Sequence, residues 1–217
     1  MCGISGIIVC DPNYPLQRMG EKMLKSLEHR GPDFSDSVYL DHNHSRIFLG
    51  HNRLSIIDLD SRSNQPFWSD DRRLLMVYNG EVFNFNDLKK DLINEGYVFH
   101  TTSDTEVVLK YYQWKGVNGF KDFKGFWAIS ILDLSKKEII LSRDQFGIKP
   151  LFFINSNSEL LFASEIKALD KVYDLSIKID VSSEFINSGK IDQYEDVSFY
   201  ETVQKVNPGS VFVFSLD

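Results

Sequence analysis

Hydrophobic positions change their spacing several times along the chain, and each change predicts a different element. Residues 3–10, GISGIIVC, are apolar at nearly every position and predict a strand close to the chain start. Within residues 16–29, leucine and methionine recur at intervals of three and four, which predicts an amphipathic helix. The sequence RGPD at residues 30–33 should end that helix, because proline cannot continue it and glycine suits its exit.

Most of the remaining chain alternates between short apolar runs and polar turns, which is typical of strands joined into sheets. Strands are predicted at residues 37–40, 46–49, 54–58, 74–77, 127–134, 138–142, 151–154, 160–163 and 210–216. Helices are predicted at residues 86–95, from about 103 to 114, near residue 164 and at residues 183–188. Ser103 and Glu106 form a capping-box pattern that starts the second helix. Short turns between consecutive strands favour antiparallel sheets with helices on their outer faces, an α+β domain.

Composition narrows the classes of function without choosing one. The chain carries 31 acidic against 24 basic residues, a net charge of −7, so we expect no nucleic-acid partner. No apolar stretch reaches the ~18 residues of a membrane helix, and the chain start has no signal-peptide pattern, so we expect no membrane association and a cytoplasmic location. His42 and His44 in a polar stretch favour a solvated loop over a metal site. Without repeats or linkers, residues 1–217 are treated as one domain.

Cys2 is the first candidate for chemistry. A cysteine at the second position is usually a residue without a role, but its setting gives it one. Removal of Met1 would leave Cys2 with a free α-amine of pKa ~7.7–8.0 beside a thiol of pKa ~8.5. One residue would then carry both a nucleophile and a base. Gly3, which is small, would let a substrate approach closely.

Three further positions allow both a structural and a functional interpretation. Asn79-Gly80 is foremost a hairpin signal, and a tight turn could also direct an amide and a backbone N–H at one point, as an oxyanion hole requires. Arg53 lies in an apolar run and fits either a strand edge or two-point binding of a carboxylate. Asp104, at the start of its predicted helix, is most simply a cap or dipole partner. Each signal is weak alone.

Together these positions fall in stretches that resemble the N-terminal glutaminase domain of glutamine-dependent asparagine synthetases, which are N-terminal-nucleophile hydrolases. The stretches occur in the family's order and cover nearly the whole chain. They read MCGISGI (1–7), HRGPD (29–33), GHNRLSIIDL (50–59), QPF (65–67), YNGEVFN (78–84), SDTEVVL (103–109), GFWAISILD (125–133), RDQFGIKPLFF (143–153), FASEIKAL (162–169) and PG (208–209). Amidotransferases that make glucosamine phosphate or phosphoribosylamine share the N-terminal cysteine, but Tyr78, HRGPD and KPLFF look more like the asparagine-synthetase branch.

The resemblance implies a role for each matching residue. Cys2 would attack the side-chain carboxamide of L-glutamine, with its α-amine carrying the proton, while Asn79 and Gly80 stabilise the oxyanion. Glutamate and ammonia would form through a γ-glutamyl thioester, and no metal is expected. Arg53 would bind the substrate α-carboxylate, and Glu81 and Asp104 its α-ammonium. The implied substrate-binding set is Arg53, Leu54, Ser55, Ile56, Ile57, Asn79, Gly80, Glu81 and Asp104.

The resemblance also implies a four-layer αββα sandwich of two antiparallel sheets, with no cofactor in this domain. ATP and Mg²⁺ are expected only in an ATP-dependent synthetase domain, which is absent from residues 1–217. That domain is expected in cis, lost by truncation after Asp217, or in trans as a partner, and a homodimer is a candidate assembly. Gln145 departs from the arginine common in the family, which we interpret as a change in structural support or in a domain interface.

Two alternatives stay open. The same glutaminase could serve a different acceptor, as in sugar or natural-product amidation. A non-catalytic relative could instead use the sandwich only to dock a partner, although loss of Cys2 or Arg53 would favour that reading and both are present. The catalytic hypothesis further expects Met1 to be removed, because a peptide-bonded Cys2 nitrogen cannot act as a base.

Overall fold

Two antiparallel sheets form the centre of the domain. The computed structural model describes residues 1–55, 61–156, 159–177 and 200–216. One sheet has the strand order β10-β8-β9-β1-β3-β2 and the other β11-β7-β6-β5-β4. The strands are β1 (Gly3–Val9), β2 (Phe34–His42), β3 (Ser45–Arg53), β4 (Phe67–Trp68), β5 (Leu74–Val82), β6 (Gly125–Asp133), β7 (Glu138–Arg143), β8 (Phe152–Asn155), β9 (Glu159–Ala163), β10 (Gln204–Lys205) and β11 (Val211–Ser215).

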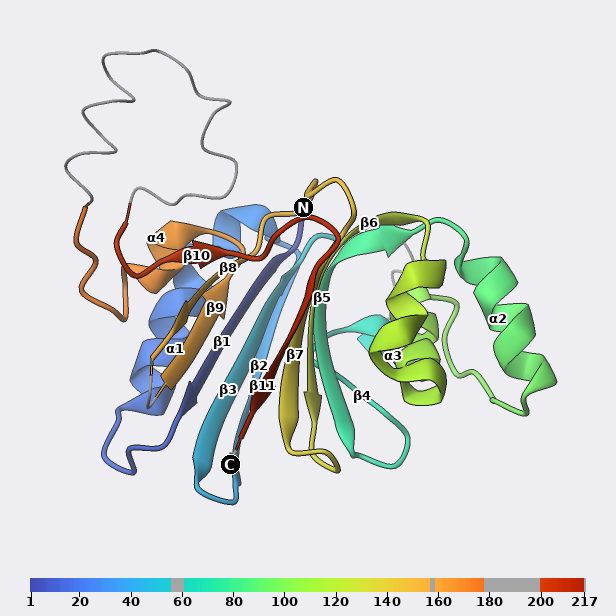
Figure 1. Ribbon diagram of the computed structural model, residues 1–217, viewed down its shortest axis with the longest axis horizontal. Helices are drawn as coiled ribbons and strands as arrows, with labels where there is room; N and C mark the ends of the chain where they lie inside the picture. Colours follow the sequence, from blue (N-terminus) through green and yellow to red (C-terminus); the bar gives the residue numbers. More distant parts are fainter. Residues whose placement is uncertain (56–60, 157–158, 178–199, 217) are drawn as a thin grey trace, which may run out of the picture.

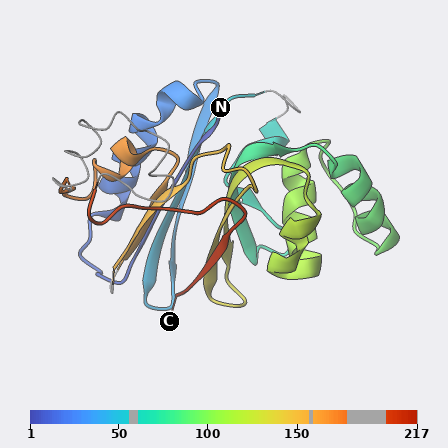
Figure 2. The same ribbon diagram turned by 45° about the horizontal axis from the view of Figure 1, so that its top comes forward.

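Helices cover the outer face of each sheet and complete four layers (Figures 1 and 2). The α-helices are α1 (Leu16–Ser26), α2 (Phe85–Asn94), α3 (Asp104–Lys115) and α4 (Ile166–Leu169), and the 3-10 turns are η1 (Glu28–Arg30), η2 (Ser61–Ser63) and η3 (Gly116–Asp122). Helices α1 and α4 pack on the six-stranded sheet, and α2 and α3 pack on the five-stranded sheet (Figure 1). The predicted αββα sandwich is therefore confirmed.

Three apolar clusters fill the spaces between these layers. Ile4 and Ile8 of β1 meet Val77 of β5 between the two sheets. On the opposite face of β5, Met76 and Tyr78 pack with the helical layer of α2 and α3. Successive side chains of a strand point to opposite faces, so β5 serves two cores at once. This alternation decides where each functional side chain of β5 points.

Of the strands and helices predicted from the sequence, one strand is wrong where it can be compared, and one helix lies outside the described residues. A strand was predicted at residues 54–58, but β3 ends at Arg53 and residues 54 and 55 adopt no regular structure, while residues 56–58 lie outside the described residues. The helix predicted at residues 183–188 also lies outside them. The β3 strand ends early because side chains take the next two backbone donors: Leu54 N donates to Cys2 Sγ at 3.4 Å and Ser55 N to Asp33 Oδ2 at 2.7 Å.

Gly6 tests the packing between the sheets. It lies between Ile4 and Ile8 on β1, and a Cβ added to it would overlap the ring of Phe162, which is fully buried. We expect Gly6→Ala to lower the free energy of unfolding by about 1–3 kcal/mol, because overpacking displaces a side chain that has nowhere to move. Urea denaturation measures this effect. An unchanged midpoint would show that the ring can shift freely and that the two sheets are loosely packed.

Candidate active site

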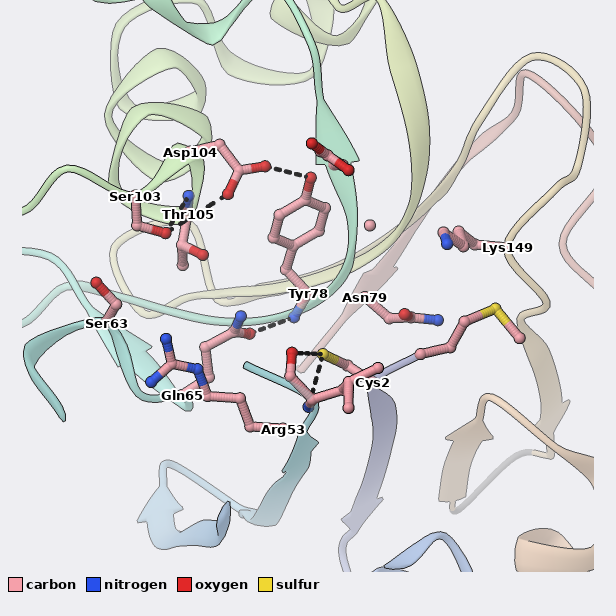
Figure 3. Close-up of a pocket in the computed structure, with 14 residues that line it drawn as sticks. Cys2, Arg53, Ser63, Gln65, Tyr78, Asn79, Ser103, Asp104, Thr105 and Lys149 are labelled. Atoms are coloured by element: carbon pink, nitrogen blue, oxygen red, sulfur yellow. Dashed lines mark hydrogen bonds between the residues drawn. The ribbon is translucent and has the colours of Figure 1, made fainter. Parts of the chain in front are cut away.

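A pocket of about 280 Å³ opens where Met1 and Cys2, just before β1, face the far half of β5 (Figure 3). Each sheet contributes one wall, and the start of α3 and the loop before β8 contribute the rest. The lining residues are Met1, Cys2, Arg53, Leu54, Ser63, Gln65, Tyr78, Asn79, Gly80, Glu81, Ser103, Asp104, Thr105 and Lys149. Seven of the residues implied by the sequence resemblance are in this set, although they come from positions up to 102 residues apart.

The Cys2 thiol lies at the wall formed by the end of β3. Its Sγ accepts from Leu54 N at 3.4 Å and lies 3.7 Å from Leu54 O. Burial raises the pKa of the thiol, while the Leu54 N–H and the positive charges of the N-terminus, Arg53 and Lys149 offset part of that shift. Met1 is present and lines the same pocket. The thiol is therefore held in place, and its ionisation depends on the charges around it.

The HRGPD stretch clamps the two backbone segments that carry Cys2 and Arg53. Arg30 Nε donates to Cys2 O at 2.9 Å, and Arg30 Nη1 donates to Glu165 at 2.7 Å, a contact that holds the pKa of Glu165 at about 2 despite its partial burial. Gly31 packs directly on the backbone of residues 52 and 53, where a Cβ would overlap it. The motif predicted to break a helix thus also fixes the geometry of the site.

Gly3 does not have the role that its size suggested. It pairs with Asn52 in the sheet, and a Cβ at Gly3 would lie 3.0 Å from Leu27 Cβ. Gly3 is also not among the residues that line the pocket. Its missing side chain makes room for packing against the end of α1.

The Asn79-Gly80 dipeptide lies within a strand, so the hairpin prediction is wrong. Asn79 and Gly80 pair with Ala128 and Trp127 across β5 and β6. A Cβ at Gly80 would overlap Phe126 O and lie 2.6 Å from Tyr78 Cε2. Glycine is required because the neighbouring strand and the Tyr78 ring occupy the space of a side chain.

Both oxyanion candidates nevertheless present a donor on the pocket side of β5. Asn79 Nδ2 is buried and has no hydrogen-bond partner among the described residues. Trp127 N donates to Asp144 Oδ2 at 3.2 Å, and Trp127 O accepts from Asp144 N at 2.9 Å, so both groups face away from β5. The Gly80–Trp127 pair is therefore one without mutual hydrogen bonds, and the Gly80 N–H points away from β6. On that side of β5, β4 pairs only with residues 75 and 76 and does not extend to the Gly80 N–H.

Opposite charges line the two ends of the pocket. Arg53 is 7% exposed and is not at a sheet edge, because β3 lies between β1 and β2; its Nη1 donates to Asn64 at 2.5 Å. At the other end lie Glu81 and Asp104. Burial raises the pKa of Asp104, the negative charge of Glu81 adds to this rise, and hydrogen bonds from Val82 N and Tyr78 Oη oppose it. A dipolar molecule with separated negative and positive groups would fit this arrangement.

The helix start predicted at Ser103 is confirmed in part. Ser103 is the N-cap of α3, and its Oγ accepts from Thr105 N at 3.2 Å. Glu106 does not close the capping box on Ser103, because its carboxylate accepts instead from the backbone N–H groups of His100 and Thr101. Asp104 accepts from Tyr78 Oη and Val82 N rather than acting as the cap.

Not every predicted site residue lines the pocket. Ser55 is held by Asp33 next to it and is not among the lining residues, and Ile56 and Ile57 lie outside the described residues. Sequence reasoning missed the remaining lining residues, which are Met1, Ser63, Gln65, Tyr78, Ser103, Thr105 and Lys149. Gln65, Tyr78 and Lys149 belong to the stretches QPF, YNGE and KPLFF, so the signal was their place within a motif.

Lys149 reaches the pocket because Asp144 organises the loop between β7 and β8. The Asp144 carboxylate is fully buried and accepts from the backbone N–H groups of Phe146, Ile148 and Lys149. Gln145 is exposed in the same loop and does not line the pocket. A single buried carboxylate thus sets the path of a loop that carries a cation to the thiol.

Comparison with known proteins decides the family. A family model described as the glutamine amidotransferase domain matches residues 1–217. This chain belongs to the glutamine amidotransferase domain family. The asparagine-synthetase-type resemblance predicted from the sequence is confirmed: asparagine synthetase [glutamine-hydrolyzing] 2 of Bacillus subtilis is 40% identical over 78% of the glutamine amidotransferase domain and 22% of its own length. Amidase chry2 of Gibberella zeae is 33% identical over 98% of the domain and 32% of its own length.

The fold of the glutamine amidotransferase domain also matches a solved structure over nearly its whole length. The solved structure of Bacillus subtilis glutamine phosphoribosylpyrophosphate amidotransferase superposes with a TM-score of 0.70 at 22% identity, over 99% of the domain and 47% of that chain. The domain therefore spans less than half the length of these relatives. In the described part of the chain, no helix has the length and apolar character required to cross a membrane.

The two cysteines of the glutamine amidotransferase domain should react in a definite order. The apolar run at residues 3–10 predicts a buried Cys10 at the end of a strand, but Cys10 is exposed because β1 ends at Val9. In protein that retains Met1, we expect iodoacetamide to modify Cys10 before Cys2 near neutral pH. Because burial raises the pKa of Cys2, its rate should keep rising above pH ~8.5, where an ordinary thiol levels off.

Peptide mapping over time measures both rates in one sample. Cys10→Ser is the control, and it should leave the rate at Cys2 unchanged. Faster modification of Cys2 than of Cys10 near neutral pH would contradict the raised pKa of the thiol.

Proposed function

We propose that this domain hydrolyses L-glutamine to glutamate and ammonia through a γ-glutamyl thioester on Cys2. The observation that carries the proposal is one pocket in which a thiol faces an unpartnered buried amide, between an arginine at one end and two carboxylates at the other. Glutamine has a carboxamide for the thiol, an α-carboxylate for the arginine and an α-ammonium for the carboxylates. Membership in the glutamine amidotransferase domain family supports the same substrate.

Charge determines how glutamine would lie in the pocket. The planar guanidinium of Arg53 can hold the α-carboxylate in two-point contact. Burial raises the pKa of Asp104 and the negative charge of Glu81 adds to that rise, so a substrate ammonium between the two carboxylates would favour their ionised forms. Leu54, whose N–H contacts the Cys2 thiol, would line the pocket beside the bound substrate. This placement directs the side-chain carboxamide toward Cys2 and Asn79.

The chemical step follows from the same geometry. The Cys2 thiolate would add to the carboxamide carbon, and the oxyanion would accept from Asn79 Nδ2 and the Gly80 N–H. Collapse of this intermediate expels ammonia after the α-amine of Cys2 delivers a proton to the leaving nitrogen. Water, deprotonated by the same amine, then hydrolyses the thioester to glutamate and restores the thiol. The step requires removal of Met1, whose peptide bond otherwise makes the Cys2 nitrogen a non-basic amide.

The ammonia acceptor is the second part of the proposal. The domain spans 22% of an asparagine synthetase relative, so we propose that ammonia passes to an ATP-dependent synthetase segment, in the same polypeptide or in a partner. ATP and Mg²⁺ would bind that segment, and this domain would need neither. A different acceptor is the second candidate, because one relative is named amidase chry2. Cys2 and Arg53 both line the pocket, which counts against a purely docking role.

Glutaminase activity is the first test. Protein whose first residue is Cys2 should release glutamate from L-glutamine, and Cys2→Ala should release none while its unfolding curve stays unchanged. Cys10→Ala is the matched control and should retain full turnover, since Cys10 lies outside this pocket. Full activity in Cys2→Ala would end the assignment of the nucleophile.

Intact-mass measurement of the same samples adds a control for the N-terminus. Protein that retains Met1 should be inactive, because the α-amine is then blocked. Turnover by that form at the rate of the processed form would remove the α-amine from the mechanism and leave the nucleophile assignment intact.

Binding and chemistry should separate in two variants. Arg53→Lys keeps the charge and loses the planar fork, so we expect KM for glutamine to rise while kcat changes little. Asn79→Ala removes an oxyanion donor, so we expect kcat to fall by ~10²–10³ with little change in KM. Steady-state kinetics measures both. If Asn79→Ala raised KM at constant kcat, Asn79 would be a ground-state contact.

A further inference from the structure

The backbone N–H, the backbone carbonyl and the hydroxyl of Tyr78 each form a hydrogen bond. Its N donates to Gln65 Oε1 at 2.6 Å, its O accepts from His51 Nε2 at 3.2 Å, and its Oη donates to Asp104 Oδ2 at 2.8 Å. Tyr78 is 2% exposed. Burial lowers the pKa of His51 to about 3, so the imidazole that donates to Tyr78 O stays neutral at ordinary pH. Three separate segments thus hold the backbone and the hydroxyl of one residue.

The position of the Tyr78 ring also depends on Gly80. Both residues point to the helical side of β5, and a Cβ at Gly80 would lie 2.6 Å from Tyr78 Cε2. The ring therefore passes over the glycine and reaches the start of α3, as Figure 3 shows for Tyr78 and Asp104. Asn79, between them, points to the opposite face. Adjacent residues of one strand thus contribute to different parts of the pocket: Tyr78 contacts Asp104, and Asn79 lies on the other face of the strand.

We infer that Tyr78 is a positioning residue for recognition of the substrate α-ammonium, which it serves by fixing the Asp104 carboxylate in the pocket. The inference rests on the proposed glutaminase function. Asp104 Oδ2 accepts from Tyr78 Oη and Val82 N, and Oδ1 accepts from Ser103 Oγ at 3.5 Å. Asp104 lines the pocket, so this carboxylate would meet the substrate ammonium in the orientation that these bonds set. Without the Tyr78 hydroxyl, the carboxylate would lose a hydrogen bond to its charged form and a constraint on its rotation.

The pH dependence of binding follows from the same contacts. Burial and the charge of Glu81 raise the pKa of Asp104, and the bonds from Val82 N and Tyr78 Oη lower it. Loss of the Tyr78 bond should raise that pKa further. Glutamine binding needs ionised Asp104, so KM should begin to rise at a higher pH on acidification in Tyr78→Phe than in the wild type. The cations Arg53 and Lys149 line the same pocket and are unchanged between the two proteins.

The experiment compares wild type, Tyr78→Phe and Tyr112→Phe, each with Cys2 confirmed as the first residue. Tyr112 is the matched control, because it is also 2% exposed and its Oη donates to Asp133 Oδ2 at 3.0 Å, but it does not line the pocket. KM and kcat are measured for L-glutamine as a function of pH. The inhibition constant is measured for glutaramate, which is glutamine without its α-amine.

We expect Tyr78→Phe to raise KM for glutamine by about tenfold or more, with kcat within about twofold of wild type. The inhibition constant of glutaramate should stay unchanged, because that molecule has no ammonium for Asp104 to bind. Tyr112→Phe should leave all three constants unchanged.

Three results would overturn the inference. One is an equal weakening of glutamine and glutaramate in Tyr78→Phe, which would indicate a general distortion of the pocket. Another is a Tyr78→Phe protein that matches the wild type at every pH. Both leave glutamine hydrolysis by the wild type standing. Absence of glutamine turnover in the wild type itself would instead overturn the proposed function, and this inference with it.

Discussion

Burial of apolar side chains between the two sheets is the constraint on which the site depends. The first residues of β1 and the far half of β5 are 75 or more residues apart in the chain, and only face-to-face packing of the sheets brings Cys2 opposite Asn79. Isoleucines of β1 and Val77 of β5 supply that packing immediately next to the pocket. The proposed nucleophile is thus positioned by the core itself, which is more rigid than a loop.

A residue near a chain end needs additional restraint, because terminal segments lose order easily. The Cys2 backbone receives it from Arg30, whose guanidinium also contacts Glu165, and the thiol receives it from Leu54. These contacts join four segments that are distant in sequence. This anchoring partly buries the thiol, and burial raises its pKa. The positive charges of Arg53 and Lys149 lower the pKa and offset part of that rise.

The layers of the fold were predictable because period-two alternation and apolar runs report local burial. The pairing of β5 with β6 around Asn79 and the end of β3 were not predictable in this way. Asn79-Gly80 predicted a turn because this dipeptide tolerates positive φ, whereas the strand continues through it because Phe126 and Tyr78 take the side-chain space of Gly80. The end of β3 was misplaced because a carboxylate 22 residues away captures Ser55 N. Both errors come from contacts that no local pattern contains.

The candidate site divides in the same way. The charged and nucleophilic residues were predicted from motifs, because their chemistry is specific to their type. Tyr78 was taken only as a marker of a subfamily, since its hydroxyl partner Asp104 lies 26 residues further along the chain. Lys149 depends on a loop shaped by Asp144, which has no signature of its own. Supporting residues are therefore harder to predict than the groups they support.

The bonding of Trp127 to Asp144 has a consequence for how errors in folding would affect this domain. A slip of one residue between β5 and β6 would turn every side chain of β5 to the other face. It would also place Gly80 in a hydrogen-bonded pair with β6, so the Gly80 N–H would donate to that strand instead of pointing away from it. Such a molecule could keep most of its secondary structure and yet lose both proposed oxyanion donors together. Catalytic competence in this domain is thus a sensitive reporter of strand alignment, more so than spectroscopic measures of its sheet content.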